Sequence, residues 1–316
     1  MKIIIGACLF FITFSSMACD ICNMSVSLSP DDAKNYLSIL YRNRYTCKNF
    51  TTLTLKEVNS QSTTRHSGVI LLPTMEDQKH EEMFSVYEVK GLYNINHKFH
   101  TTVSIPFIQN IREINDVKQF QIDGIGDPIV MAKYHLIRTS FENKLNHLVT
   151  LGSGLKIPLG SYDFENNGQK VEHDIQAGTG TLDFVFSLNY LIKYKKAGLS
   201  LNTNYKANTM NKTVDYMFGN TFNSTLNLFY MHKIGENYSL LPYIGAYGEI
   251  AGKDIENNQF EQNTGSKVVF GTVGLQFFFY QFKVEAMFQH VMHTELNGLL
   301  QLETKNRVQT GISYLF

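Results

Sequence analysis

"TLDFVFSLNYLIKY", residues 181–194, alternates large apolar side chains with polar ones over most of its length. One set of alternate positions is entirely apolar and comprises Leu182, Phe184, Phe186, Leu188, Tyr190 and Ile192. The other set carries the polar side chains Asp183, Ser187, Asn189 and Lys193. Because successive side chains of a strand point to opposite faces, this stretch predicts a β-strand with one apolar and one polar face.

The same alternation recurs in twelve segments of the chain. They are residues 36–45, 84–95, 98–107, 127–137, 147–160, 181–194, 198–207, 222–232, 240–250, 268–279, 282–290 and 308–316. These segments have 9 to 14 residues each. A tilted strand of about 9–11 residues is long enough to cross a bilayer. Each segment is therefore a candidate membrane-spanning strand.

The connections between these segments alternate between long and short. The long ones are roughly residues 48–82, 109–123, 161–178, 208–220, 251–267 and 291–307. The short ones lie around residues 96–97, 138–146, 195–197, 233–237 and 280–281. Long polar loops at one end and short turns at the other are typical of outer-membrane barrels, whose long loops are external and whose short turns are periplasmic.

These patterns predict an all-β chain with a single antiparallel transmembrane β-barrel of about 12 strands over residues 35–316. In lipid every backbone N–H and C=O must be paired, so a sheet spans a membrane only when it is closed. A secreted β-sandwich or solenoid would also show alternating strands. Neither alternative explains charges on one face of nearly every strand opposite an apolar face.

The N-terminus has the features of a secretory signal peptide over residues 1–18. Lys2 precedes an apolar region, and Ser16-Met17-Ala18 supplies small residues for cleavage. No later stretch has 18 consecutive apolar residues, so we expect no transmembrane helix. Residues 19–34 precede the first strand, and we expect them to lie either in the periplasm or inside the barrel as a plug.

Three cysteines follow the signal peptide: Cys19, Cys22 and Cys47. Cys19 and Cys22 are weak candidates for a metal or redox site, because their spacing supplies only two thiol ligands. A disulfide between them, or one that involves Cys47, is the simpler interpretation. Cys19 is also a possible lipid-attachment site, although Ser-Met-Ala-Cys lacks the usual leucine. Met and His side chains in "MFQHVMH", residues 287–293, also suit a metal such as copper. We expect this stretch on the opposite side of the membrane from Cys19, so the two do not form one shared site.

Composition and motifs exclude several functional classes. The 28 Lys and Arg residues balance the 28 Asp and Glu residues, so the chain has no basic excess that would favour a nucleic-acid partner. The sequence contains no nucleophile elbow, no His-Glu-x-x-His motif and no phosphate-binding loop. We therefore expect neither an enzyme nor a bound cofactor.

The polar faces of the strands supply candidate lumen-lining residues. They are Arg42, Arg44, Glu88, Lys90, Asp127, Lys133, His135, Lys156, Asp183, Lys193, Lys206, Glu249, Lys283 and Glu285. Two interpretations remain open for this set. Opposite charges could pair and simply fill the interior of a barrel of this size. Alternatively, the same side chains could line a pore and set its selectivity.

Several short motifs at strand ends resemble one known family. They are "DGIGDPIVMAKY", "SGLKIPLGSYD", "SIPF" and "GTGTLDFVFSLNY", and they involve Gly124, Asp127, Lys156, Pro158 and Asp183. In this order the motifs resemble the outer-membrane barrel family named after the meta-pathway of phenol degradation. This family is grouped with porins and long-chain fatty-acid transporters. The "CDIC" at residues 19–22 and the scarcity of charge are similar to proteins of the Bacteroidetes type.

The resemblance implies passage of small molecules, apolar ones among them, across the outer membrane. We expect a monomer whose partners are outer-membrane lipid, the barrel-assembly machinery and a small-molecule solute. The chain ends in "GISYLF", residues 311–316, which places Ile312, Tyr314 and Phe316 on one face. The resemblance implies that Tyr314 and Phe316 form the signal that the assembly machinery reads. The alternative function is a non-conducting barrel that displays its loops for adhesion or interaction.

Overall fold

The computed structural model describes residues 34–59, 69–141, 144–299 and 301–316, and these residues form mostly β-strands. Twelve strands build the barrel wall: β1 (Tyr36–Asn59), β2 (Val69–Asn94), β3 (Phe99–Ile114), β5 (Ile129–Arg138), β6 (Leu145–Lys156), β9 (Asp183–Tyr194), β10 (Ala197–Ala207), β12 (Thr221–Tyr230), β14 (Tyr238–Ala251), β17 (Ser266–Phe279), β18 (Phe282–Leu296) and β19 (Glu303–Leu315). All neighbouring pairs are antiparallel.

The wall closes on itself. The last strand, β19, pairs with the first, from Tyr36 opposite Leu315 to Cys47 opposite Glu303. β12 and β14 also pair, although the short strand β13 (His232–Lys233) lies between them in the chain. The expected closed antiparallel barrel of twelve strands is therefore confirmed, with β4 (Val117–Ile125) and β13 as additional strands of the same sheet.

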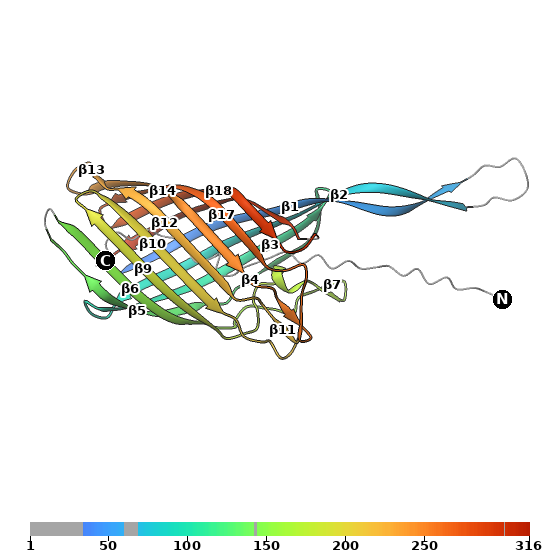
Figure 1. Cartoon of the computed structure of the whole chain (residues 1–316), viewed down its shortest axis with the longest axis horizontal. Helices are drawn as coiled ribbons and strands as arrows, with labels where there is room; N and C mark the ends of the chain where they lie inside the picture. The colour runs from blue at the N-terminus through green and yellow to red at the C-terminus, as the bar shows by residue number, and fades with distance from the viewer. Residues whose placement is uncertain (1–33, 60–68, 142–143, 300) are drawn as a thin grey trace, which may run out of the picture.

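Loop lengths differ between the two ends of the barrel (Figure 1). At one end, called here the short-turn end, Asn35 and Phe316 exchange two backbone hydrogen bonds of 3.1 and 2.9 Å. The other end, called the long-loop end, carries the minor elements β7 (Glu165–Asn166), β8 (Gln169–Lys170), η2 (His173–Ile175), β11 (Tyr216–Met217), β15 (Ile255–Glu256) and β16 (Gln259–Phe260). The predicted separation of long and short connections is confirmed.

For two of the long connections, residues 48–82 and 109–123, the prediction of a loop is wrong because strands continue through them. β1 and β2 pair without interruption as far as Asn59 opposite Val69, where a loop was expected over residues 48–82. Beyond Cys47 and His80 these two strands pair only with each other, among the described residues, and form a ribbon that projects from the barrel (Figure 1). We call this segment the β1–β2 ribbon. Its Thr-rich sequence favours continued strand structure.

The expected loop at residues 109–123 is also a hairpin. β3 continues to Ile114, and β4 follows after a two-residue turn. Asn115 and Asp116 in that turn have φ values of 52° and 61°. Positive φ at both central residues is the geometry of the tight hairpin turn that suits twisted strands, and Asn and Asp tolerate it better than most residues.

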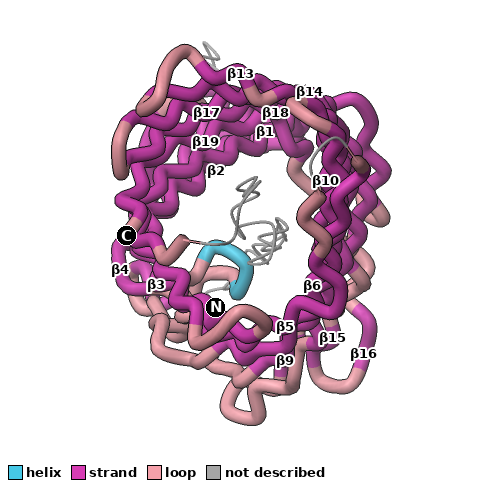
Figure 2. Tube along the Cα trace, turned by 90° about the vertical axis from the view of Figure 1, so that its left-hand side faces the viewer, coloured by secondary structure: helices cyan, strands magenta, loops and turns pink. Residues whose placement is uncertain are grey.

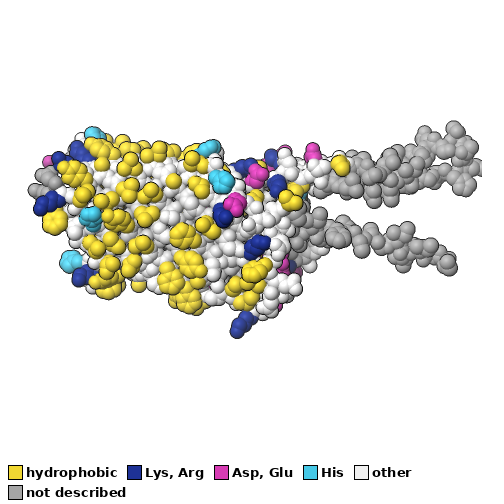
Figure 3. Space-filling model, viewed as in Figure 1, with side chains coloured by type: hydrophobic (Ala, Val, Ile, Leu, Met, Phe, Trp, Pro, Cys, Tyr) yellow, Lys and Arg dark blue, Asp and Glu magenta, His cyan; other side chains and the backbone are white. Residues whose placement is uncertain are grey.

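The outer surface of the barrel wall exposes many large apolar side chains, as Figure 3 shows for one face. Ile312, Tyr314 and Phe316 are 44%, 47% and 60% exposed, as expected for the lipid-facing stripe of the last strand. Aromatic rings contact one another around the short-turn end from β14 to β19, through Tyr238, Phe277, Phe279, Tyr280, Phe282, Tyr314 and Phe316. Such a band of aromatic side chains is typical of a membrane interface. Within the described residues, the structure contains no helix with the length and apolarity needed to span a membrane.

Candidate functional site: the barrel lumen

The structure places the predicted lumen-lining residues on the inner side of the barrel. On β1, buried Arg42 and Arg44 alternate with exposed Leu37 and Ile39, and on β18 buried Glu285 alternates with exposed Val284. Most of the predicted set is buried, whereas Lys90, Lys133 and Lys193 are half-buried. The burial pattern is consistent with an inward position for these residues, and their role in selectivity stays a prediction.

Several of these charges form buried ion pairs. Arg42 Nη2 lies 2.5 Å from Glu88 Oε2, and Lys283 Nζ lies 2.9 Å from Glu285 Oε2. Arg307, which was not in the predicted set, pairs with Glu249 at 3.1 Å. Buried charges must be paired because an isolated one is strongly disfavoured. Pairing within the wall therefore accounts for part of the predicted charge set.

A buried charge triad brings together three of the sequence motifs. Lys156 Nζ lies 3.1 Å from Asp127 Oδ2 and 2.7 Å from Asp183 Oδ2, and all three side chains are almost fully buried. The backbone N–H groups of Gly160 and Thr179 each donate to Asp127 at 2.9 Å. We call Asp127, Lys156 and Asp183 the anchor triad, because it fixes both ends of the loop formed by residues 157–182 to the wall.

Residues 157–182 connect β6 to β9. Seen along the barrel axis, η2 lies inside the ring of strands, whereas β7 and β8 project at the long-loop end (Figures 1 and 2). Two glycines allow the ends of this loop to touch. A Cβ on Gly178 would lie 2.5 Å from the carbonyl oxygen of Gly160, so no larger side chain fits there. Gly178 N also donates to Ser161 O at 2.8 Å. We call residues 157–182 the inward loop.

The inward loop covers an apolar part of the inner wall near the long-loop end. Ile175 and its neighbours form a buried cluster with side chains of β2 and β4, comprising Phe84, Ile122, Val171, Ile175 and Ala177. Asn110 Nδ2 donates to Ile175 O at 2.7 Å. A signal for this cover was present in the sequence, because Phe84, Val86, Tyr87 and Val89 are apolar on both faces of one strand. An apolar inner face needs protein or solute against it.

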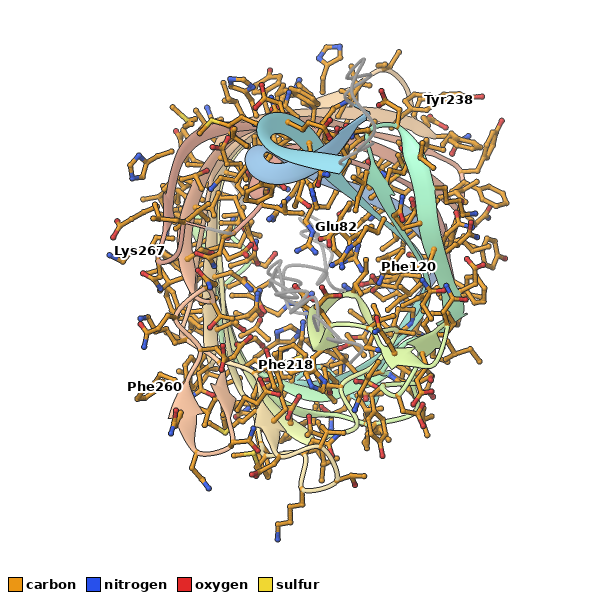
Figure 4. All side chains as sticks on the ribbon, turned by 90° about the vertical axis from the view of Figure 1, so that its right-hand side faces the viewer. Glu82, Phe120, Phe218, Tyr238, Phe260 and Lys267 are labelled. Carbon is orange, nitrogen blue, oxygen red and sulfur yellow. The ribbon has the colours of Figure 1, made fainter. Side chains whose placement is uncertain are left out.

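Arg112 joins the inward loop to the barrel wall. Its guanidinium donates to Glu172 Oε2 in the loop at 2.6 Å and to Glu82 Oε1 on β2 at 2.5 Å. It also lies over the Phe120 ring, 5.2 Å from the ring centroid. Seen from the long-loop end, Glu82 lies inside the ring of strands, whereas Lys267 and Phe260 lie on the outside (Figure 4). Sequence reasoning missed this group because it expected loops here.

A second contact joins three long loops to one another. The His173 ring of the inward loop stacks on Tyr216, with 4.1 Å between ring centroids. Tyr216 Oη donates to Asp254 Oδ2 at 2.5 Å, and Gly219 N donates to Asp254 Oδ1 at 2.7 Å. Burial raises the pKa of the Asp254 carboxyl to about 6 and lowers the pKa of His173 to about 4. We call His173, Tyr216 and Asp254 the loop latch.

One side of the lumen is polar but uncharged. Inward positions along the middle of β9, β10 and β12 carry Ser187, Asn189, Ser200, Asn202, Asn204, Asn223, Thr225 and Asn227. Several are paired: Asn204 donates to Asn223 at 3.0 Å and Asn189 to Asn202 at 2.5 Å. The strand order puts these strands opposite β19, β1 and β2, which carry the ion pairs. The lumen therefore has a neutral wall facing a charged wall.

The remaining predicted sites are not assembled by the described residues. Cys19, Cys22, the predicted signal peptide and nearly all of residues 19–34 lie outside them. Cys47 is a half-buried free thiol. Within the described ranges, no three His, Cys, Asp or Glu side chains gather as a metal site. In the stretch at residues 287–293, Met287 is buried whereas His290 is exposed and contacts Asn306 at 3.0 Å.

Comparisons with known proteins agree with this architecture. A family described as "Putative MetA-pathway of phenol degradation" matches residues 86–295. An outer membrane channel from Pseudomonas putida F1 is similar in structure, with a TM-score of 0.63, 12% identity, and coverage of 92% of this chain and 100% of that chain. At this identity the likeness shows the fold alone. No curated protein sequence matches the chain.

Two further barrels are more distant. The β domain of the Bordetella autotransporter BrkA has a TM-score of 0.48 and 9% identity, with 90% of this chain and 100% of that chain covered. A Pseudomonas aeruginosa FadL homologue has a TM-score of 0.40 and 8% identity, with 90% of each chain covered.

Proposed function

This chain belongs to the MetA-pathway phenol-degradation family, and we propose that it is an outer-membrane channel for passive passage of small, largely apolar molecules. The observation that carries the proposal is the two-sided wall of the closed barrel. Its outer face is apolar and carries a band of aromatic side chains at the short-turn end, and its inner face holds paired charges and amides. A closed sheet of this kind spans lipid and encloses a polar interior.

The apolar character of the solute is supported by buried apolar clusters on the inner wall. One lies under the inward loop near the long-loop end, and another lies near the short-turn end around Phe229 and Tyr243. Apolar surface inside a polar lumen favours solutes that bury apolar area. The anchor triad and the inward loop would narrow the entrance and set which solutes pass.

The orientation and assembly follow from the same reasoning. The long-loop end would be external and the short-turn end periplasmic, because the first wall strand begins and the last wall strand ends at the short-turn end. Residues 1–18 would direct export, and Tyr314 with Phe316 would be read during assembly. The barrel would work as a monomer in outer-membrane lipid and without a cofactor.

A second function is favoured by one feature, the β1–β2 ribbon that projects beyond the barrel (Figure 1). Outside the wall its two outer edges are unpaired among the described residues, and such edges can pair with strands of other proteins. A non-conducting barrel that displays this ribbon for adhesion is therefore the alternative.

Uptake of the apolar dye N-phenylnaphthylamine by intact Gram-negative cells separates the two functions. Its fluorescence rises when it passes the outer leaflet and reaches phospholipid. Cells that make this chain should take up the dye faster than cells with empty vector. A matched variant in which a two-residue turn replaces residues 48–79 should keep this uptake. Uptake equal to the vector control, together with cell adhesion that disappears in the ribbon variant, would favour the alternative.

A further inference from the structure

Positive side chains collect in the half of the lumen next to the short-turn end. Among the described residues, seven charged side chains occupy buried or half-buried inward positions within six residues of the short-turn end of their wall strand. Five are cations and two are anions: Arg42, Lys90, Lys133, Lys193 and Lys283 against Glu88 and Glu285. This part of the inner wall, called here the basic half, therefore has an excess of three positive charges.

The excess does not depend on which side chains are in contact. Both carboxylates already contact a cation, at 2.5 Å for Glu88 and 2.9 Å for Glu285. Each carboxylate compensates one positive charge, so two of them leave three of the five cations uncompensated. Lys90, Lys133 and Lys193 are half-buried, so they present charge to the interior of the barrel. Lys90 also lies within electrostatic range of Lys133, so their fields add.

The rim of the short-turn end is basic as well (Figure 3). The short connections at this end carry five exposed lysines, which are Lys98, Lys144, Lys195, Lys196 and Lys233. Glu236 is the acidic residue among the described residues of these connections. Charges of one sign around an opening focus the electric field and raise the local concentration of counter-ions. The rim and the basic half therefore act in the same direction on a passing ion.

The part of the lumen nearer the long-loop end has no such excess. The anchor triad holds two carboxylates on one ammonium, and Arg112 lies between the carboxylates of Glu82 and Glu172. At buried or half-buried positions there, the described wall, the β4–β5 connection and the inward loop combine five cations with six carboxylates. They are Arg44, Arg112, Lys156, Lys206 and Arg307 with Glu82, Asp127, Glu172, Asp174, Asp183 and Glu249. The positive excess is thus confined to the basic half.

We propose that the basic half is an anion-selective filter, through which the barrel passes small monovalent anions as a second class of solute. The inference goes beyond the proposed function, which concerns largely apolar molecules. Lys90, Lys133 and Lys193 set the preference, because rings of Lys and Arg side chains in a pore favour anions over cations. Salt weakens a fixed-charge effect of this kind, since the screening length is about 10 Å at 0.1 M and about 3 Å at 1 M.

The test measures the reversal potential of the purified full barrel in a planar bilayer under a gradient of KCl. A lumen potential of about one kT would enrich chloride and deplete potassium about threefold each, which gives a permeability ratio of chloride to potassium of about seven. We expect a ratio of this order near 0.1 M salt and a ratio that approaches one near 1 M.

Paired substitutions show whether charge sets the ratio. Lys90→Gln with Lys133→Gln reduces the excess from three charges to one, and the ratio should fall to about two. Lys90→Glu with Lys133→Glu leaves three cations against four anions, and the preference should reverse in favour of potassium. Lys90→Arg with Lys133→Arg keeps both charges and should keep the wild-type ratio.

Lys267→Gln is the matched control. Lys267 is exposed on the outer face, where it pairs with Glu295 at 3.0 Å, so the same loss of charge occurs outside the lumen. This variant should keep the wild-type ratio. Heat-modifiable gel migration verifies that each variant is a closed barrel. A wild-type ratio near one at low salt, an inserted barrel without current, or a double Gln variant with the wild-type ratio would overturn the filter.

The dye assay separates this inference from the proposed function. A barrel that admits the dye but conducts without preference, or prefers potassium, would refute the filter and retain the channel for apolar molecules. A barrel with anion-selective currents that does not speed uptake of the dye would retain the filter and refute passage of apolar molecules.

Discussion

Replacement of Lys156 by Met should release the inward loop and destabilise the barrel. The Lys156 ammonium is fully buried and lies 3.1 and 2.7 Å from the carboxylates of Asp127 and Asp183. Methionine has a similar length but no charge, so the variant leaves two buried carboxylates without their shared cation. Removal of one partner from a buried ion pair typically costs about 3–5 kcal/mol. We expect a loss of that order in the free energy of unfolding.

A second substitution shows whether the cost comes from the unpaired charges. Asp183→Asn in the Lys156→Met background removes one of the two carboxylates. Asp127 would still accept the Gly160 and Thr179 backbone N–H groups. The double variant should therefore recover about half of the lost stability or more. Lys193→Met, at a half-buried position of the same inner wall, serves as the control and should change stability by less than about 1 kcal/mol.

Urea unfolding in detergent micelles measures these differences. The chain has 17 Tyr and no Trp, so tyrosine fluorescence and heat-modifiable migration are the appropriate signals. In planar bilayers, Lys156→Met should also give larger conductance steps than wild type, because the inward loop loses its anchor. An unfolding midpoint equal to that of Lys193→Met, with unchanged conductance, would refute the role of the anchor triad.

Three further perturbations test other parts of the structure. Arg112→Leu removes the contacts that join the inward loop to β2, and it should raise the mean conductance without changing the strand content measured by circular dichroism. The Asp254 carboxyl has a pKa of about 6 in the latch against an ordinary value of 3.8, so its contribution to loop closure is complete below about pH 4 and is lost as pH rises through 6. The ratio of open probabilities of wild type to Asp254→Asn should therefore rise up to about tenfold from pH 5 to pH 7.5, and a constant ratio would exclude this effect. Deletion of Phe316 removes the last member of the aromatic band at the short-turn end. It should lower the amount of assembled barrel in membranes more than it alters the conductance of the barrels that do form.

The wall of the barrel could be predicted from sequence because lipid and lumen impose opposite requirements on alternate side chains. That constraint located all twelve wall strands and placed residues such as Arg42 and Glu285 on the inner face. The β1–β2 ribbon and the β3–β4 hairpin lie where loops were expected. The distinction between spanning and projecting strands depends on pairing partners, which a single sequence does not specify.

The interior of the barrel was harder to predict because it depends on contacts between distant segments. Nothing local in residues 157–182 indicates that they turn inward, although the apolar inner positions of β2 indicate that something covers them. Arg112 and Asp254 gain their roles only when loops meet. The neutral wall was overlooked because charged residues were taken as the markers of a lumen lining, and uncharged amides such as Asn202 give no such signal.

Single-channel recording of the purified mature chain in a planar bilayer tests the central claim most directly. Insertion is verified on the same preparation by heat-modifiable migration and by recovery of the protein in the lipid fraction. A channel with this lumen should give stepwise ionic currents. An inserted, closed barrel that remains electrically silent under every applied voltage would contradict the proposed function.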